Sequence, residues 1–294
     1  MPTVPQGRPY LFFLLPCLVF LVGLAAFPTA FLFYMSFTDY LLTRGPYPQG
    51  FAGLANYLWL FTSPSEGGSY WVYSFTLTAE YVVGTVAAEY LLGLGFALLL
   101  RSQIRGKNVL RVLVTIPIVA APVVAGLSWR YMYDSSIGII NWTLRSLNLP
   151  TRAWLGDPAL ALPSVMIASV WEWTPFVFLV MLAGLESMPK DLYEAADIDG
   201  CSAWQKFRYL TSPLLFQLSV ITLLFRIMEE FKTFDIIAVT TLGGPGLSTT
   251  TISWYIYSIA FSRFDMGKAA AAGLLLLAIL TIAITPLTRR AFKR

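Results

Sequence analysis

Six long apolar stretches constrain this chain more than any other feature of its sequence. Each is long enough to supply the roughly 20 mostly apolar residues that a helix needs to cross a bilayer. They cover residues 10–37, 73–100, 109–133, 160–185, 213–239 and 269–287. Only 12% of the residues are charged, whereas about 25% is usual in a soluble domain. The sequence therefore predicts an all-α integral membrane protein with six transmembrane helices.

The first apolar stretch must be distinguished from a secretory signal peptide, which also contains an apolar run. It is too long for that role, and Pro16 and Pro28 interrupt it without an obvious cleavage site. We therefore interpret it as the first membrane span. No Ser/Gly-rich linker or shift in composition divides the chain, which predicts a single transmembrane domain over residues 1–294.

The positions of lysine and arginine predict the orientation of the spans, because cytoplasmic loops carry an excess of these residues. With the N-terminus inside, the cytoplasmic segments hold twelve of them and the external segments six, while Arg226 and Lys232 lie in the fifth stretch. The opposite orientation would invert this bias. We therefore expect both termini in the cytoplasm, together with the polar segment between the fourth and fifth spans.

Several residue types needed for catalysis are missing from the sequence. The chain has no histidine, which removes His-based triads and the usual histidine metal ligands. It contains no GxxxxGK[ST] motif for ATP hydrolysis. Cys17 and Cys201 suggest neither a disulfide framework nor a metal site. We expect a protein that is not an enzyme and holds no cofactor, and the small net charge of +4 gives no indication of nucleic-acid binding.

The polar segment over residues 187–212 has the signals of a short helix pair. Pro189 is tolerated in the first turn of a helix, and Gly200 can supply the left-handed residue that ends one. Ser202 followed by Gln205 resembles a capping box for a second short helix. By itself this pattern fits either a docking element at the membrane surface or an ordinary surface loop.

Charged residues also occur inside the apolar stretches, where they usually face a pathway or pair with one another. Glu80 and Glu89 lie in the second stretch. Two further stripes share helical spacing on the fourth and fifth stretches: Ser169, Glu172, Trp173 and Phe176, and Arg226, Glu229, Glu230 and Thr233. Such a mixture of acids, hydroxyls and aromatic rings suits a polyol ligand. Two alternatives remain open: Arg226 pairs with Glu230 while the acids only join spans, or the acids form a proton relay.

The polar segment resembles the EAA loop of ATP-binding-cassette (ABC) importer permeases. That pattern runs EAA, three residues, Gly, nine residues, Ile, any residue, Leu, Pro. The matching residues here are Glu194, Ala195, Ala196, Asp199, Gly200, Phe207, Leu210 and Pro213. The spacing is kept throughout, although Leu210 replaces the Ile and Ser212 replaces the Leu.

Further matches narrow the resemblance to sugar-type permeases similar to the maltose and glycerol-phosphate systems. They are Ser36–Tyr40, Gly53–Leu54, Asn56–Tyr57, Pro117, Trp129, Gly243–Pro245 and Thr249–Thr251. The resemblance implies a multi-pass subunit in a bacterial or archaeal cytoplasmic membrane, surrounded by lipid. Its implied partners are a second, similar permease, two ATPase subunits that use ATP and magnesium, and an extracytoplasmic substrate-binding protein.

The resemblance also implies roles for individual residues. The helix pair would dock into a cleft of the ATPase through Glu194, Ala195, Ala196, Asp199, Gly200, Phe207 and Pro213. Counting from Glu194, the sugar-binding positions of maltose-type permeases fall on Ser169, Glu172, Trp173, Phe176, Arg226, Glu230 and Thr233. The residue types on the fifth stretch differ from those of the maltose protein.

The expected function is therefore to pass an oligosaccharide, disaccharide or related polyol across the membrane by alternating access. Three alternatives are weighed against it. A glycerol-phosphate permease would favour a cationic pocket, and Arg226 beside Glu229 and Glu230 supplies little positive potential. A secondary transporter driven by protons or ions would use the intramembrane acids. An integral-membrane enzyme is disfavoured by the absence of histidine.

Overall fold

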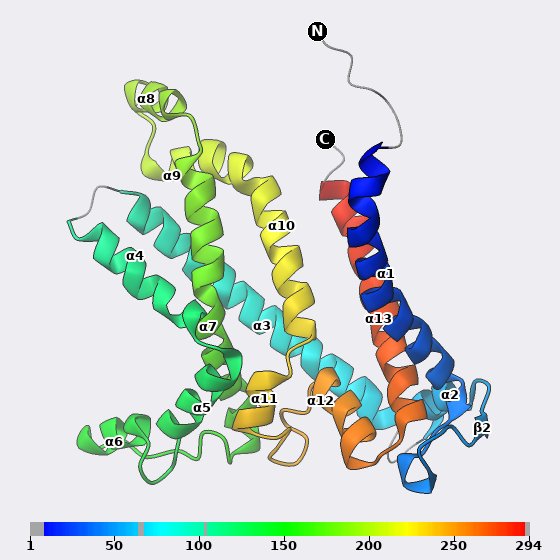
Figure 1. Cartoon of the computed structure of the whole chain (residues 1–294). Coiled ribbons are helices and arrows are strands. Elements are labelled where there is room, and N and C mark those ends of the chain that lie inside the picture. Colours follow the sequence, from blue (N-terminus) through cyan, green and yellow to red (C-terminus); the bar gives the residue numbers. More distant parts are fainter. Residues whose placement is uncertain (1–8, 64–67, 103–104, 292–294) are drawn as a thin grey trace. The chain divides into compact units, whose positions relative to one another are not determined.

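The computed structural model describes residues 9–63, 68–102 and 105–291 and is almost entirely helical (Figure 1). The chain divides into two compact units, which we describe in turn. The first unit comprises residues 1–69 with 256–279, and the second residues 70–255 with 280–294. The expectation of a single transmembrane domain stays a prediction. The basic residues Arg8, Lys293 and Arg294, which contributed to the expected orientation, lie outside the described residues.

The first unit is built around α1 (Pro9–Ser36), which is apolar and widely exposed from residue 13 onward. A small meander follows it, consisting of β1 (Thr38–Asp39), η1 (Leu42–Arg44), β2 (Gly50–Phe51) and α2 (Ala55–Thr62). The unit also contains η4 (Ser258–Ser262), a π-helical turn, and α13 (Met266–Ala291) up to residue 279.

A buried polar cluster fastens the end of α1 to this meander. Asn56 donates hydrogen bonds from Nδ2 to the carbonyl oxygens of Ser36 and Thr38, both at 2.9 Å. The Tyr57 hydroxyl donates to Ser36 Oγ at 2.7 Å. Near the start of α13, a side chain at Gly267 would collide with the Thr38 carbonyl oxygen. Buried polar groups must be paired. Ser36, Thr38, Asn56 and Tyr57, which also carry the resemblance to sugar-type permeases, therefore have a structural role.

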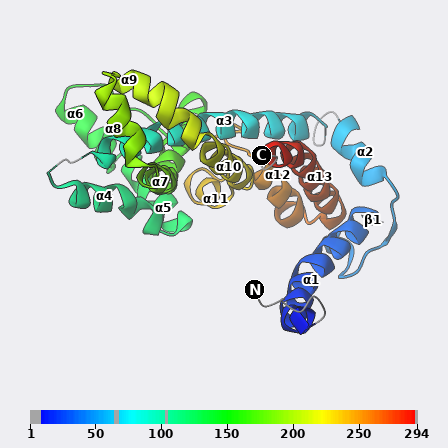
Figure 2. The same ribbon diagram turned by 90° about the horizontal axis from the view of Figure 1, so that it is seen from above.

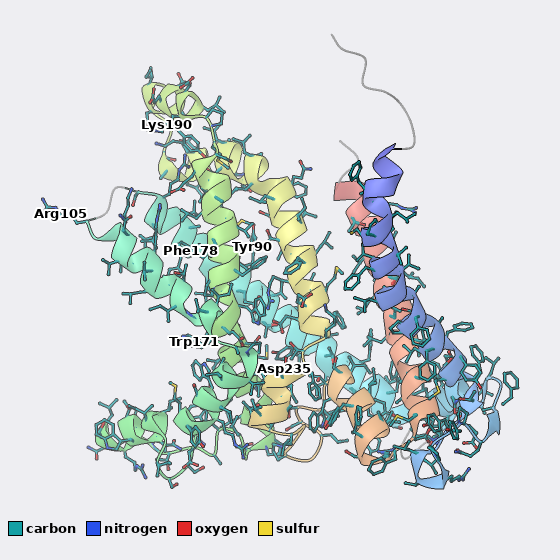
Figure 3. The ribbon with its side chains drawn as sticks, viewed as in Figure 1. Tyr90, Arg105, Trp171, Phe178, Lys190 and Asp235 are labelled. Atoms are coloured by element: carbon teal, nitrogen blue, oxygen red, sulfur yellow. The ribbon has the colours of Figure 1, made fainter. Side chains whose placement is uncertain are left out.

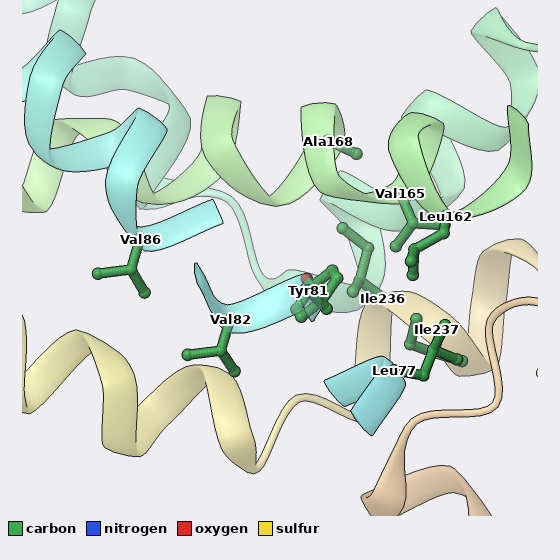
Figure 4. Packing of buried hydrophobic residues seen from close by; sticks show 9 residues of the cluster. All are labelled: Leu77, Tyr81, Val82, Val86, Leu162, Val165, Ala168, Ile236 and Ile237. Carbon is green, nitrogen blue, oxygen red and sulfur yellow. The ribbon is translucent and has the colours of Figure 1, made fainter. Parts of the chain in front are cut away.

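Three long helices form the second unit: α3 (Gly68–Arg101), α7 (Pro158–Glu186) and α10 (Ser212–Phe231). One core cluster joins α3, α7 and the short α11 (Asp235–Thr240), with Tyr81, Leu162 and Ile237 among its members (Figure 4). A second cluster packs α3, α7 and α10 around Phe178. Gly93 allows α3 to approach α7 closely, since a Cβ there would lie 2.9 Å from the Phe178 backbone nitrogen.

The third apolar stretch, which is expected to form a span over residues 109–133, is not one straight helix. It forms α4 (Lys107–Thr115), the 3-10 turn η2 (Ile116–Val119) and α5 (Pro122–Met132), with a bend of 100° between the two helices. Figure 1 shows the bend, and Figure 2 shows α4 and α5 from above. The cause is Pro122, which lacks an amide proton and disfavours helical geometry at the residue before it. Ala121 is accordingly extended, with φ −65° and ψ 141°.

The boundaries around the fifth apolar stretch also differ from expectation. The second helix of the polar pair, α9 (Ala203–Lys206), is not a separate short helix. It continues through the π-helical segment η3 (Phe207–Thr211) into α10, so one helix runs from Ala203 to Phe231. The chain then breaks over residues 232–234 before α11, so the helix ends earlier than the expected residue 239.

The remaining described elements of the second unit are α6 (Ile139–Ser146), α8 (Lys190–Ile198) and α12 (Ile252–Tyr257), the last of which ends in the first unit. Over the described residues, five helices are long and apolar enough to cross a membrane, and a sixth crossing is present if the bent pair α4–α5 counts as one. The chain is therefore a mostly helical protein with five or six candidate spans.

Candidate functional site

A buried cluster of charges joins α3 to α10. Arg226 forms a bidentate salt bridge with Glu89, donating from Nε to Oε2 at 2.7 Å and from Nη2 to Oε1 at 2.9 Å. Its Nη2 also donates to Glu230, one turn further along α10. The side chains of all three residues are at most 1% exposed. The cluster thus holds one base and two acids away from water.

Neighbouring side chains complete the surroundings of this cluster. Trp173 of α7 covers the guanidinium, whose Cζ lies 4.2 Å from the ring centroid. Ser169 Oγ donates to Glu230 Oε1 and Thr233 Oγ1 donates to Oε2, both at 3.1 Å. Charges out of water must be paired to be tolerated, so the cluster ties α3, α7 and α10 together at one level.

A cavity of about 230 Å³ opens beside the cluster. It is lined by Pro122, Ser169, Glu172, Trp173, Arg226, Glu229, Glu230, Lys232, Thr233, Phe234, Asp235 and Ile236. Six of the seven sugar-binding positions expected from the sequence are among these residues. The seventh, Phe176, is not, because its ring packs against Phe225 at a centroid distance of 5.1 Å.

The side chains that line this cavity include groups that can bind hydroxyls. Glu172 and Glu230 offer carboxylate oxygens as acceptors, Ser169 and Thr233 add hydroxyls, and Trp173 supplies an aromatic face. Aromatic faces cover the C–H surfaces of a ligand, while a few placed polar groups fix its orientation. Over the described residues, no group of three Asp, Glu, Cys or His side chains is placed to hold a metal ion.

Sequence reasoning identified both stripes of the cavity but missed the partner of Arg226. Glu89 stood out only as an acid inside an apolar stretch, and it lies 137 residues from Arg226. Pairing of Arg226 with Glu230, one of the interpretations left open, is present in the structure. Glu229, Lys232 and Asp235 also line the cavity, because the chain turns where α10 ends.

The second polar region is the pair α8–α9, and its local structure confirms the expected helix end at Gly200 and the expected capping box. Gly200 ends α8 in the left-handed conformation, with φ +72°. The capping box is formed: Ser202 N donates to Gln205 Oε1 at 2.7 Å, and Gln205 N donates to Ser202 Oγ at 3.3 Å. Pro189 precedes the first residue of α8 as its N-cap.

Tyr193 connects helix α8 to the long helices. Its hydroxyl lies 2.9 Å from Thr211 Oγ1, and the Arg101 guanidinium stacks over its ring at 4.2 Å. Ala196 is buried, whereas Glu194 and Ala195 are exposed. Figure 3 labels Lys190, at the start of α8, and Asp235, at the cavity, near opposite ends of α10. The two polar regions are thus separated along the second unit.

Long apolar helices, a bent helix pair and a polar cavity are features that suit a membrane transport subunit. The chain belongs to the family of binding-protein-dependent transport system inner membrane components, whose model matches residues 5–293. It is therefore a multi-pass permease subunit of an ABC importer.

Individual relatives agree with this assignment. The chain is 40% identical over 217 residues to the trehalose/maltose transport system permease protein MalF of Thermococcus litoralis, covering 74% of this chain and 70% of that protein. It is 36% identical over 281 residues to the probable ABC transporter permease protein y4oQ of Sinorhizobium fredii, covering 96% and 89%. The sulfoquinovosyl glycerol transport system permease protein SmoG of Agrobacterium fabrum is 33% identical over 90% of this chain and 84% of its own.

Among solved structures, the fold is similar to a chain of a bacterial ABC transporter involved in the import of the acidic polysaccharide alginate. The TM-score is 0.83 at 20% sequence identity, and the match covers 97% of this chain and 96% of that one. This likeness establishes the ABC permease fold.

Proposed function

We propose that this permease passes an oligosaccharide, a disaccharide or a related polyol across the membrane by alternating access. The observation that carries the proposal is the cavity, which is lined by Glu172, Glu230 and Trp173. The relative MalF, named for trehalose and maltose, supports the same substrate class. The sugar would contact Ser169, Glu172, Trp173, Glu230 and Thr233. Arg226 would act by holding Glu230 and Trp173 in place, and Phe176 by supporting Trp173 from behind.

The energy source is proposed to lie in partner subunits. The chain has no P-loop motif, so ATP and magnesium would be used by two ATPase subunits in the cytoplasm. A second, similar permease would complete the pathway, and an extracytoplasmic binding protein would deliver the substrate. This arrangement fits six spans with both termini in the cytoplasm of a bacterium or archaeon, as the lysine and arginine bias indicates.

The pair α8–α9 is proposed to receive the ATPase. Glu194, Ala195, Asp199 and Gly200 are exposed. The small residues Ala195 and Gly200 would allow a close approach of the two backbones, and Glu194 would pair with a basic group of the ATPase. Ala196, Phe207 and Pro213 would hold the pair against the spans.

The test is to purify the chain from its native membrane with its partners and to reconstitute the complex in proteoliposomes. The proposal predicts co-purification of an ATPase and uptake of trehalose or maltose that requires ATP and is insensitive to a protonophore. Uptake by this chain alone, driven by a proton gradient, would instead establish a secondary transporter.

A further inference from the structure

The charges around the cavity have a consequence for the kind of carbohydrate it accepts. We propose that the cavity selects carbohydrates that carry no negative charge, whether neutral or amino-substituted, and excludes acidic sugars and sugar phosphates. This inference rests on the proposed function and deepens it by specifying the charge class of the substrate.

The one guanidinium in the cavity is already occupied. Arg226 uses Nε and Nη2 to bind Glu89 and Glu230, and Trp173 covers its face. Within the described residues, Nη1 is the nitrogen of this guanidinium that has no hydrogen-bond partner. Strong recognition of a carboxylate or phosphate by arginine uses two parallel N–H donors. Nη1 is itself buried, so Arg226 has no pair of free donors for an anion.

The second base is occupied as well. Lys232 Nζ lies 2.6 Å from Glu229 Oε1, so its charge is matched by an acid of the same lining. Glu172 and Asp235 then remain on the wall without an ion pair to a base among the described residues. In total, four acids and two bases line the cavity, and Glu89 lies directly behind Arg226. Even with a proton on Glu172, the acids of the lining still outnumber the bases.

An excess of acids discriminates strongly between anionic and neutral ligands when the site is partly screened from water. The Coulomb interaction between charges rises as the effective dielectric constant falls, so an anionic ligand meets repulsion that water does not cancel. A neutral sugar meets none, and its hydroxyl groups donate hydrogen bonds to the carboxylates. An ammonium substituent gains an ion pair. The expected order of preference is therefore cationic or neutral over anionic, by about tenfold or more.

This charge class is a property of the chain's own site. The fold is shared with an importer of the acidic polysaccharide alginate, but at 20% identity that likeness concerns the arrangement of helices. The acids at Glu172, Glu230 and Asp235 predict the opposite charge preference for this chain.

The experiment uses the complete importer in proteoliposomes and three ligands of matched size. They are the neutral disaccharide (whichever of trehalose and maltose is imported), its derivative with one primary alcohol oxidised to a carboxylate, and its derivative with that hydroxyl replaced by an amine. Uptake is measured for each ligand in the wild type and in Glu172→Gln/Asp235→Asn. Because the same binding protein serves both, its selectivity cancels when the anionic-to-neutral uptake ratios of wild type and variant are compared.

The inference predicts that the anionic-to-neutral ratio rises about tenfold in the double variant. Glu80→Gln is the matched control, since it removes an acid from α3 that does not line the cavity, and its ratio should stay unchanged. Glu229→Gln, at the more exposed rim, should give a smaller rise and serves if the double variant does not assemble. An unchanged ratio in both cavity variants would overturn the inference, as would equal or preferred uptake of the anionic ligand by the wild type. If no carbohydrate is imported at all, the proposed function falls, and the inference with it.

Discussion

The two polar regions of the second unit lie in the same apolar chain but accommodate their polar side chains in opposite ways. Around Arg226 the charged side chains are buried and bind one another. On α8–α9 both polar and apolar side chains are exposed, and Ile198 is 87% exposed. Burial requires internal partners, whereas exposure leaves a surface for an external one. The difference teaches that the charge cluster holds helices in place, while the helix pair leaves exposed side chains that a partner could contact.

The largest expected effect comes from breaking the buried cluster. Arg226→Ala leaves Glu89 and Glu230 buried without a base, which should destabilise the fold by about 3–5 kcal/mol. We expect a large loss of folded protein and a lowered unfolding temperature in detergent, measured by fluorescence-detected size exclusion and thermal unfolding.

A matched control separates the lost charge pairing from the lost side chain. Arg226→Met with Glu89→Gln and Glu230→Gln removes all three charges at similar volume. It should recover most of the stability, because a buried ion cluster contributes little beyond neutral packing of the same shape. Equal stability of Arg226→Ala and the wild type would contradict the structural role.

The next effect concerns the exposed pair α8–α9, where we expect a loss of function with little loss of stability. Gly200→Asp places a side chain in open space, since no atom lies within 4 Å of a Cβ there. The strained φ of +72° should cost only about 1–2 kcal/mol. We expect the protein to reach the membrane while ATP hydrolysis becomes uncoupled from transport, measured as ATP consumed per sugar imported. Normal coupling in this variant would contradict the docking role.

A smaller effect is expected at the cavity wall. Trp173→Ala removes the aromatic face and the stacking on Arg226, each contact of this kind contributing about 0.5–2 kcal/mol. Sugar uptake should fall about tenfold, with a smaller fall in Trp173→Phe, which keeps a ring. Transport unaffected by Glu172→Ala, Trp173→Ala and Glu230→Ala together would refute the substrate site.

The smallest effect is local to α9. Ser202→Ala removes the side-chain acceptor of the capping box, which should cost about 1 kcal/mol. Because α9 continues into α10, we expect faster amide exchange at the start of this helix and little change in the unfolding temperature. A matched Ser136→Ala variant, in the loop between α5 and α6, should leave exchange in α9 unchanged.

The sequence predicts those parts of the fold that depend on neighbouring residues. Apolar length identified the spans, Gly200 marked the end of α8, and Ser202 with Gln205 marked the start of α9. These signals are local, because capping and left-handed turns involve residues only a few positions apart. The continuity of α9 with α10 was not predicted, since Pro213 reads as a helix start. The π-helical segment before it widens the turn where the proline lacks an amide proton.

The sequence predicted which residues line the candidate site but not which of the charged residues bind one another. Helical spacing placed Ser169, Glu172 and Trp173 on one stripe and Arg226 with Glu230 on another, and the structure brings both to one cavity. Glu89 could not be assigned, because its contact with Arg226 depends on how α3 packs against α10. The break before Pro122 was hidden by the uniform apolarity of the third stretch.

The most direct test of the contrast between the two regions is a cross-linking measurement on the purified importer. Ile198→Cys, on exposed α8, is introduced after Cys17 and Cys201 are replaced by serine, and Ile137→Cys, exposed in the loop between α5 and α6, is the control. We predict that a short bifunctional reagent joins residue 198 to the ATPase and does not join residue 137 to it. No product from residue 198, or equal products from both positions, would contradict the account.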